Sequence, residues 1–114
     1  MNIVIKRAYD APSAADGYRV LVDRLWPRGV KKEALQLDEW CKDVAPSTEL
    51  RQWFAHDPAK FNEFAVRYVH ELRQSQAPQE LLSRVQGTTL TLVYAAKDQH
   101  VNHAQVLREY LATL

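Results

Sequence analysis

The segment Tyr18-Arg19-Val20-Leu21-Val22-Asp23 decides which fold class this chain of 114 residues can adopt. Its centre, Val20-Leu21-Val22, is an unbroken aliphatic run, which is typical of a strand buried on both faces in the middle of a sheet. Pro27 and Gly29 predict the end of this strand, because proline cannot donate to a β-ladder and glycine favours a turn. The segment therefore predicts a sheet that is covered on both sides.

Three other segments are candidates for strands of the same sheet. Ile3 to Lys6 predicts a short strand, and Thr89 to Ala95 is the clearest strand of the chain because β-branched and aromatic residues dominate it. Leu37 to Val44 is compatible with a strand or a helix, and we favour the strand. The link between the first two strands is about as short as a parallel crossover can be, so a hairpin is the open alternative.

Helix signals fill the sequence between these strands. Lys31 to Leu35 fits a short helical turn, and each longer helix is predicted to start at a capping residue or a proline. The longest helix starts at Asp57-Pro58, and the next one ends at Gly87. The other predicted starts are Ser47, Pro78 and Asn102, the last with Gln105 in capping-box spacing. The buried face of the final helix is expected to carry Ala104, Leu107, Leu111 and Leu114.

Strands interleaved with helices predict an α/β fold, a single three-layer domain over residues 1–114 with a small, mainly parallel sheet flanked by helices. Hydrophobic residues make up 46% of the chain and charged residues 25%, and this composition excludes a disordered or collagen-like chain. The lone cysteine, Cys41, cannot form an internal disulfide, and no apolar run is long enough to span a bilayer. We therefore expect a soluble, cytoplasmic protein with no membrane partner.

Charge is unevenly distributed along the chain, although its sum is only +1. Residues 1–32 hold seven Lys or Arg and three Asp, a net charge of +4, whereas residues 33–114 hold eight Lys or Arg and eleven Asp or Glu, a net charge of −3. A basic surface in the N-terminal third is the expectation. The pI near 7.9 is lower than that of a dedicated nucleic-acid-binding domain.

The candidate site lies where the predicted strands end, because open α/β sheets bind ligands outside the carboxyl ends of their strands. Arginine provides a fork of N–H donors that matches phosphate or carboxylate oxygens, and tryptophan can stack on a ring. The last strand also leads into a capped helix, whose N-terminus favours an anion. The expected ligand-binding residues are Arg7, Tyr9, Arg24, Trp26, Arg28, Lys97 and Asn102, and the expected acid or base residues are Asp23, Asp98 and His103.

This pattern predicts a small-molecule enzyme or a ligand-binding domain. The expected ligand is an anion that carries a phosphate or a carboxylate, such as a nucleotide-like compound. The pattern identifies no cofactor. The structural alternative is an ion-pair network of Asp23, Arg24 and Arg28 at the end of the sheet. The functional alternative is a nucleic-acid-binding accessory or regulatory protein that uses the basic and aromatic segment from Arg24 to Lys32.

Several other residues have simpler structural explanations. Trp53 and Phe54 are expected in the core, and a protein-interaction surface would need them to be exposed. Cys41 is expected to be a small buried hydrophobe rather than a nucleophile. Asp98 and His103, with His100 between them, have a spacing from which a metal could be held, but helix entry explains His103 equally well, so no metal site is predicted.

The run Asp23-Arg24-Leu25-Trp26-Pro27-Arg28-Gly29 resembles the YeaO-like proteins of the bacterial domain-of-unknown-function family 488. The resemblance covers nearly the whole chain and includes Pro46-Ser47, Tyr94-Ala95-Ala96-Lys97-Asp98 and Asn102-His103-Ala104. It implies a small α/β domain with mainly parallel strands, which favours a crossover over a hairpin, and it implies no known reaction. Longer relatives carry Cys-His-Arg at the start of the last helix, so the resemblance retains only His103 there and implies no cysteine chemistry.

Overall fold

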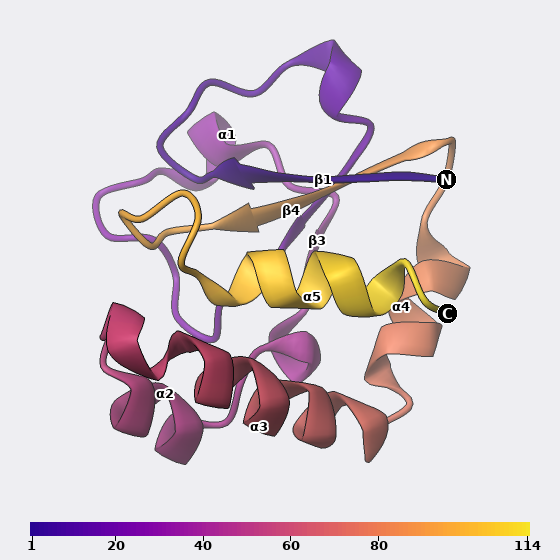
Figure 1. Cartoon of the computed structure of the whole chain (residues 1–114). Helices are drawn as coiled ribbons and strands as arrows, with labels where there is room; N and C mark the ends of the chain where they lie inside the picture. Colours follow the sequence, from indigo (N-terminus) through magenta and orange to yellow (C-terminus); the bar gives the residue numbers. More distant parts are fainter.

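The computed structural model describes residues 1–114 and shows a four-stranded parallel sheet with helices on both faces (Figure 1). The strands are β1 Asn2–Arg7, β2 Tyr18–Leu21, β3 Glu39–Trp40 and β4 Thr89–Tyr94. The α-helices are α1 Lys32–Leu35, α2 Thr48–Phe54, α3 Phe61–Arg73, α4 Ala77–Arg84 and α5 His103–Leu111. Short 3-10 helices are η1 Ala14–Asp16, η2 Lys42–Val44 and η3 Pro58–Lys60. None of these helices combines the length and apolar character needed to cross a membrane. The predicted α/β fold is confirmed.

β4 lies between β1 and β2 in the strand order β1-β4-β2-β3, and it pairs with both neighbours in parallel. In this register Leu92 lies beside Ile5 on one side and beside Val20 on the other. β1 and β2 therefore do not pair with each other. The hairpin alternative is wrong, because a hairpin requires adjacent antiparallel strands.

Alternate residues of the two central strands supply separate cores on the two faces of the sheet. Val20 and Val22 belong to the larger core, which contains side chains from α2, α3, α4 and α5. Leu21 and Val93 belong to a smaller core that Leu35 of α1 closes. Figure 1 shows α3 and α5 on one side of the sheet and α1 on the other. Because these aliphatic side chains are almost fully buried, each contributes about 1.5–3 kcal/mol to folding, and the central run is confirmed as a strand covered on both faces.

The segment 37–44 forms less strand than predicted. Only Glu39 and Trp40 pair with β2, and the Cys41 N–H makes the last backbone bond to that strand. The chain then turns into η2, where the Ala45 N–H donates to the Lys42 carbonyl. A 3-10 turn satisfies its own backbone groups, so the ladder stops there and β3 is a very short edge strand.

The ends of two helices also differ from the sequence prediction. α4 ends three residues before Gly87, because Val85 is extended, and Gly87 instead forms the turn before β4 with φ 88°. α5 ends at Leu111, so Leu114 is 50% exposed rather than buried. Val106 takes a place in the core that the predicted helix face did not include.

Gly17 holds a close approach between η1 and the start of β4. Its φ is 64°, and a Cβ at this position would lie 2.4 Å from the Thr89 carbonyl oxygen. Two residues further along β4, the Thr91 hydroxyl donates a hydrogen bond to the Asp16 carbonyl at 2.6 Å. Glycine is therefore required at position 17 both for its backbone conformation and for the space it leaves.

Candidate functional site

The loops that follow β1, β2 and β4 lie at one edge of the sheet, because these strands run parallel. The arrowheads of β1 and β4 point toward this edge in Figure 1. Every residue expected to form the site ends one of these strands or follows it in the sequence. The structure places them in this region, but hydrogen bonds and ion pairs divide them into groups with different surroundings.

One group, which we call the basic edge, consists of Arg7, Tyr9, Arg28 and Lys97. Arg7 Nε donates to the carbonyl of Ala96, the residue before Lys97, at 3.0 Å, and its guanidinium carbon lies 5.0 Å from the centre of the Tyr9 ring. The Tyr9 hydroxyl donates to the Arg28 carbonyl at 3.0 Å. These contacts fasten the loops after β1, β2 and β4 to one another at this edge of the sheet.

The cations of the basic edge take part in none of the four ion pairs between Lys or Arg and a carboxylate, nor in the contact between His103 and Asp23. Lys6 and Arg19 differ, because both bind the Asp16 carboxylate, at 3.1 and 2.6 Å. Burial alone would raise the pKa of Asp16, but hydrogen bonds from the Ser13 backbone N–H and from these two cations outweigh it and hold the pKa below its usual value. No carboxylate of the chain forms a comparable ion pair with Arg7, Arg28 or Lys97.

Arg24 lies outside the basic edge. Its guanidinium nitrogens face the backbone carbonyls of Pro46, at 3.3 Å, and Ala45, at 3.5 Å, just before α2. No ion pair joins Asp23 to Arg24 or to Arg28. The ion-pair network considered as the structural alternative is therefore not formed.

Asp23 and His103 form the one acid–base pair among the predicted residues. Asp23 Oδ2 accepts a hydrogen bond from the Ala95 N–H at 2.9 Å. His103 Nε2 lies 2.9 Å from Asp23 Oδ1 and 3.2 Å from the Val22 carbonyl oxygen. The ring nitrogen is better aligned with the carbonyl, which leaves the buried Oδ1 without a hydrogen bond. The pair joins the ends of β2 and β4 to the first residue of α5.

Asp98 and Asn102 shape the loop that leads into α5. Asp98 Oδ1 accepts hydrogen bonds from the backbone N–H groups of Val101 and His100, and these bonds lower the pKa of Asp98 below its usual value. Asn102 caps α5, because its side-chain oxygen accepts from the Gln105 N–H and its amide donates to the Asp98 carbonyl. Asp98 is therefore a turn residue separate from the Asp23–His103 pair. No group of three His, Cys, Asp or Glu side chains is arranged to hold a metal ion.

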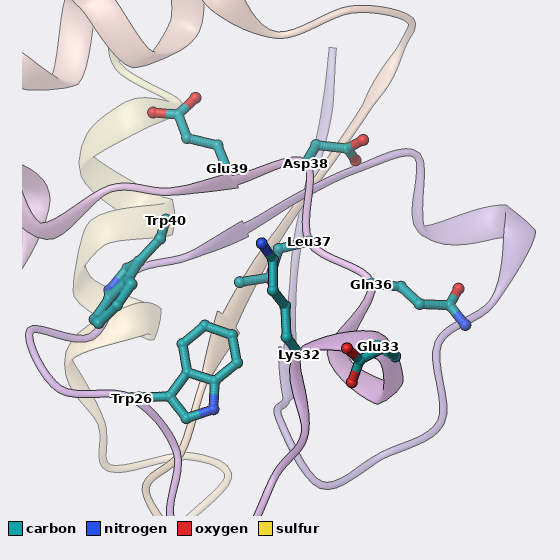
Figure 2. Close-up of a pocket in the computed structure, with 8 residues that line it drawn as sticks. All are labelled: Trp26, Lys32, Glu33, Gln36, Leu37, Asp38, Glu39 and Trp40. Carbon is teal, nitrogen blue, oxygen red and sulfur yellow. The ribbon is translucent and has the colours of Figure 1, made fainter.

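Trp26 lies against Trp40 rather than over a cation of the basic edge. The two ring centres are 5.3 Å apart at an angle of 67°, an edge-to-face arrangement (Figure 2). Trp26 Nε1 donates to the Val30 carbonyl at 2.7 Å, which fixes the indole within its own loop. The sequence placed Trp26 near the correct edge but gave no sign of its partner.

A polar contact between α2 and α3 was not predicted. Glu71 accepts two hydrogen bonds from Ser47, from the hydroxyl at 2.6 Å and from the backbone N–H at 2.9 Å. One turn earlier on α3, the Tyr68 hydroxyl donates to the Val44 carbonyl, and burial raises the pKa of Tyr68 well above its usual value. The three-residue spacing of Tyr68 and Glu71, which places both on one helix face, is the signal that could have identified them.

The simpler explanations given for Phe54 and Cys41 are confirmed, since both side chains are buried. Burial raises the pKa of the Cys41 thiol, which disfavours the nucleophilic thiolate. Trp53 is partly exposed, and the guanidinium of Arg67 lies 4.2 Å from its ring centre. Trp53 and Phe54 therefore do not form one exposed aromatic surface.

Together these features define a class of protein, a small α/β domain with an entirely parallel sheet and candidate ligand residues in the loops after its strands. A family model described as "Inactive DUF488-N3 subclade" matches residues 2–114. The chain therefore belongs to the YeaO-like DUF488 family.

Two relatives show how completely the chain matches this family. It is 48% identical over 115 residues to "Uncharacterized protein YeaO" of Escherichia coli (strain K12), and the match covers 100% of both chains. It is 45% identical over 110 residues to "Uncharacterized protein Rv3073c" of Mycobacterium tuberculosis (strain ATCC 25618 / H37Rv), with 96% of this chain and 93% of that protein covered. No solved structure matches the chain.

Proposed function

We propose that the chain is a binding domain for an anionic small molecule, which it recognises at the basic edge without catalysing a reaction. The observation that carries this proposal is the set of basic-edge cations with no carboxylate partner. A phosphate or carboxylate placed among Arg7, Arg28 and Lys97 would accept charge-assisted hydrogen bonds from these side chains, none of which is paired with an anion within the chain. We place this function in the cytoplasm, because Cys41 is free and a reducing compartment suits a lone thiol.

Three considerations support binding rather than catalysis. The matching family model is described as inactive. The resemblance to longer relatives, which carry Cys-His-Arg at the start of the last helix, retains only His103 in Asn102-His103-Ala104. Asp98 is occupied by two backbone N–H groups. The Asp23–His103 pair is the part of the site that an enzymatic activity would need, and its contacts to backbone atoms also explain it as a fastening between β2, β4 and α5.

The test is a thermal-shift series with phosphate, nucleotides, phosphorylated sugars and dicarboxylates at constant ionic strength. An anion that binds the folded chain at about 100 times its Kd stabilises it by about 2.7 kcal/mol, a readily measured rise in Tm. Arg28→Gln combined with Lys97→Gln should abolish this rise. Arg73→Gln, which removes an exposed charge on α3, is the control and should leave the response to the anion unchanged.

Two outcomes would contradict the proposal. The first is a panel in which no anion stabilises the unaltered protein. The second is an equal loss of response in Arg73→Gln, which would indicate a general charge effect. Binding of a short oligonucleotide that weakens steeply with salt, without any response to small anions, would favour the nucleic-acid alternative built on the segment from Arg24 to Lys32.

A further inference from the structure

A groove of about 520 Å³ lies between α1 and the edge strand β3 (Figure 2). Its apolar wall is formed by Trp26, Trp40 and Leu37, and no residue of the basic edge lines it. Trp40 is 37% exposed. The groove is large enough for a metabolite-sized ligand. Trp26 also packs against the smaller core, but the proposed anion site uses neither of the two partly exposed indoles.

The indoles form the corner of an aromatic cage. Their planes meet at 67°, so they give the groove two differently oriented aromatic walls. Both indole N–H groups are already used, by the carbonyls of Val30 and Asp23, each at 2.7 Å, which fixes the orientation of the rings. The Lys42 ammonium lies 4.2 Å from the centre of the Trp40 ring, so this indole already holds a cation of the chain itself.

Carboxylates outnumber cations along the groove. Glu33, Asp38 and Glu39 line it together with one lysine, Lys32. Glu39 is neutralised by Arg84 at 2.6 Å, but neither Glu33 nor Asp38 takes part in an ion pair. Figure 2 shows the indoles at one end of the groove and Glu33 at the other. Lys32 lies between them in this view, so a positive ligand bound at the indoles reaches the unpaired carboxylates only if it extends along the groove.

We propose that this groove binds a small organic cation, an alkylated ammonium or guanidinium compound, with the indoles of Trp26 and Trp40 as its walls and Glu33 and Asp38 as its counter-charges. Cations of this kind are attracted to the faces of tryptophan and lose less hydration than a bare ammonium ion when they leave water. The site is independent of the proposed anion site because the two share no side chain; Trp26, which the sequence suggested as an anion-site residue, is assigned here to the groove.

The first experiment titrates tryptophan fluorescence in a Trp53→Phe background, so that the two groove tryptophans are the reporters. The probes are choline, agmatine and 3,3-dimethylbutan-1-ol, the uncharged isostere of choline, at constant ionic strength. We expect saturable changes with at least one of the two cations and binding of the neutral isostere that is about tenfold weaker or more. No saturation with either cation, or equal responses to choline and its isostere, would overturn the proposal.

The second experiment locates the charge that the ligand recognises. Glu33→Gln and Asp38→Asn should each weaken binding of the responding cation by about threefold, and Lys32→Gln should tighten it, because each changes the charge beside the ligand. An asparagine at position 38 can still accept the Arg19 N–H that Asp38 binds at 2.8 Å, so the fold is retained. Glu63→Gln on α3 makes the same charge change away from the groove and should have no effect. Equal weakening in Glu63→Gln would show that the cation responds only to net charge and would overturn the assignment.

Discussion

Asp16 is the residue on which the buried charge of this protein depends. The Arg19 side chain is almost fully buried, and besides the carboxylate its guanidinium binds the Leu35 carbonyl at 2.8 and 3.2 Å. Removing one partner of a buried ion pair leaves an uncompensated charge, which costs more than the pair contributes. The Asp16 carboxylate therefore connects β1 and β2 through Lys6 and Arg19, and the Arg19 guanidinium extends this network to α1.

We predict that Asp16→Asn lowers the free energy of unfolding by about 3 kcal/mol at pH 7. The folded-state pKa of Asp16 lies below its unfolded value, so its contribution is present above pH 4 or so and is lost as the pH falls through the folded pKa. Urea unfolding at pH 7 and pH 3 should therefore show a smaller acid loss in the variant than in the unaltered protein. Glu63→Gln, which removes an exposed i,i+4 pair, should change stability by less than about 0.5 kcal/mol, and a comparable loss there would contradict this explanation.

Alanine substitutions at Gly17 and Gly29 separate the cost of a positive φ from the cost of a steric clash. Gly17→Ala is expected to lower stability by about 2 kcal/mol or more, because the added methyl meets the Thr89 carbonyl and alanine must adopt a positive φ. Gly29 also has a positive φ, 78°, but has open space around it, so Gly29→Ala should cost only about 1 kcal/mol. Thermal unfolding of both variants measures the difference, and equal losses would show that the contact with Thr89 is not limiting.

Two helix starts were predictable from the sequence because each depends on a bond within three residues: Ser47 caps α2 and Asn102 caps α5. The predicted start of the longest helix at Asp57-Pro58 is wrong, because Asp57 caps the 3-10 helix η3 and α3 starts only at Phe61. The extent of β3 was not predictable, because it depends on where β2 offers a partner. In the candidate site, too, local features were predictable and long-range contacts were not. The ends of the strands could be assigned from hydrophobic runs, whereas the direction of the Arg24 side chain depends on Pro46, a residue distant in the sequence.

At the scale of one element, the cap of α5 offers a prediction. Asn102 is 1% exposed and bonds both the Gln105 N–H and the Asp98 carbonyl. Asn102→Ala should cost about 1–2 kcal/mol of stability, since the helix loses its cap and the Asp98 carbonyl loses a donor. Asn102→Asp keeps the cap acceptor and should cost less. Chemical unfolding measures both, and an unaffected Asn102→Ala variant would mean that the helix start is held by packing alone.

For the whole molecule, the decisive feature is that β4 pairs with both β1 and β2 through backbone hydrogen bonds. A chain that ends at Gly87 lacks β4 and α5, so we predict that it does not fold, because β1 has no neighbour and the larger core loses one wall. A chain that ends at Leu111 loses only the residues after α5 and should fold. Proton NMR dispersion and cooperative thermal unfolding distinguish these results, and a folded 1–87 fragment would contradict the prediction.

The late position of β4 in the sequence also determines when the sheet can form during synthesis of the chain. The strand that belongs between β1 and β2 is synthesised after both of them and after α1, α2, α3 and α4. Ile3, Ile5 and Val20 are therefore made well before Leu90 and Leu92, which lie beside them in the sheet. The sheet can close only after β4 has also emerged from the ribosome, and until then the nascent chain exposes the kind of apolar segment that chaperones shield.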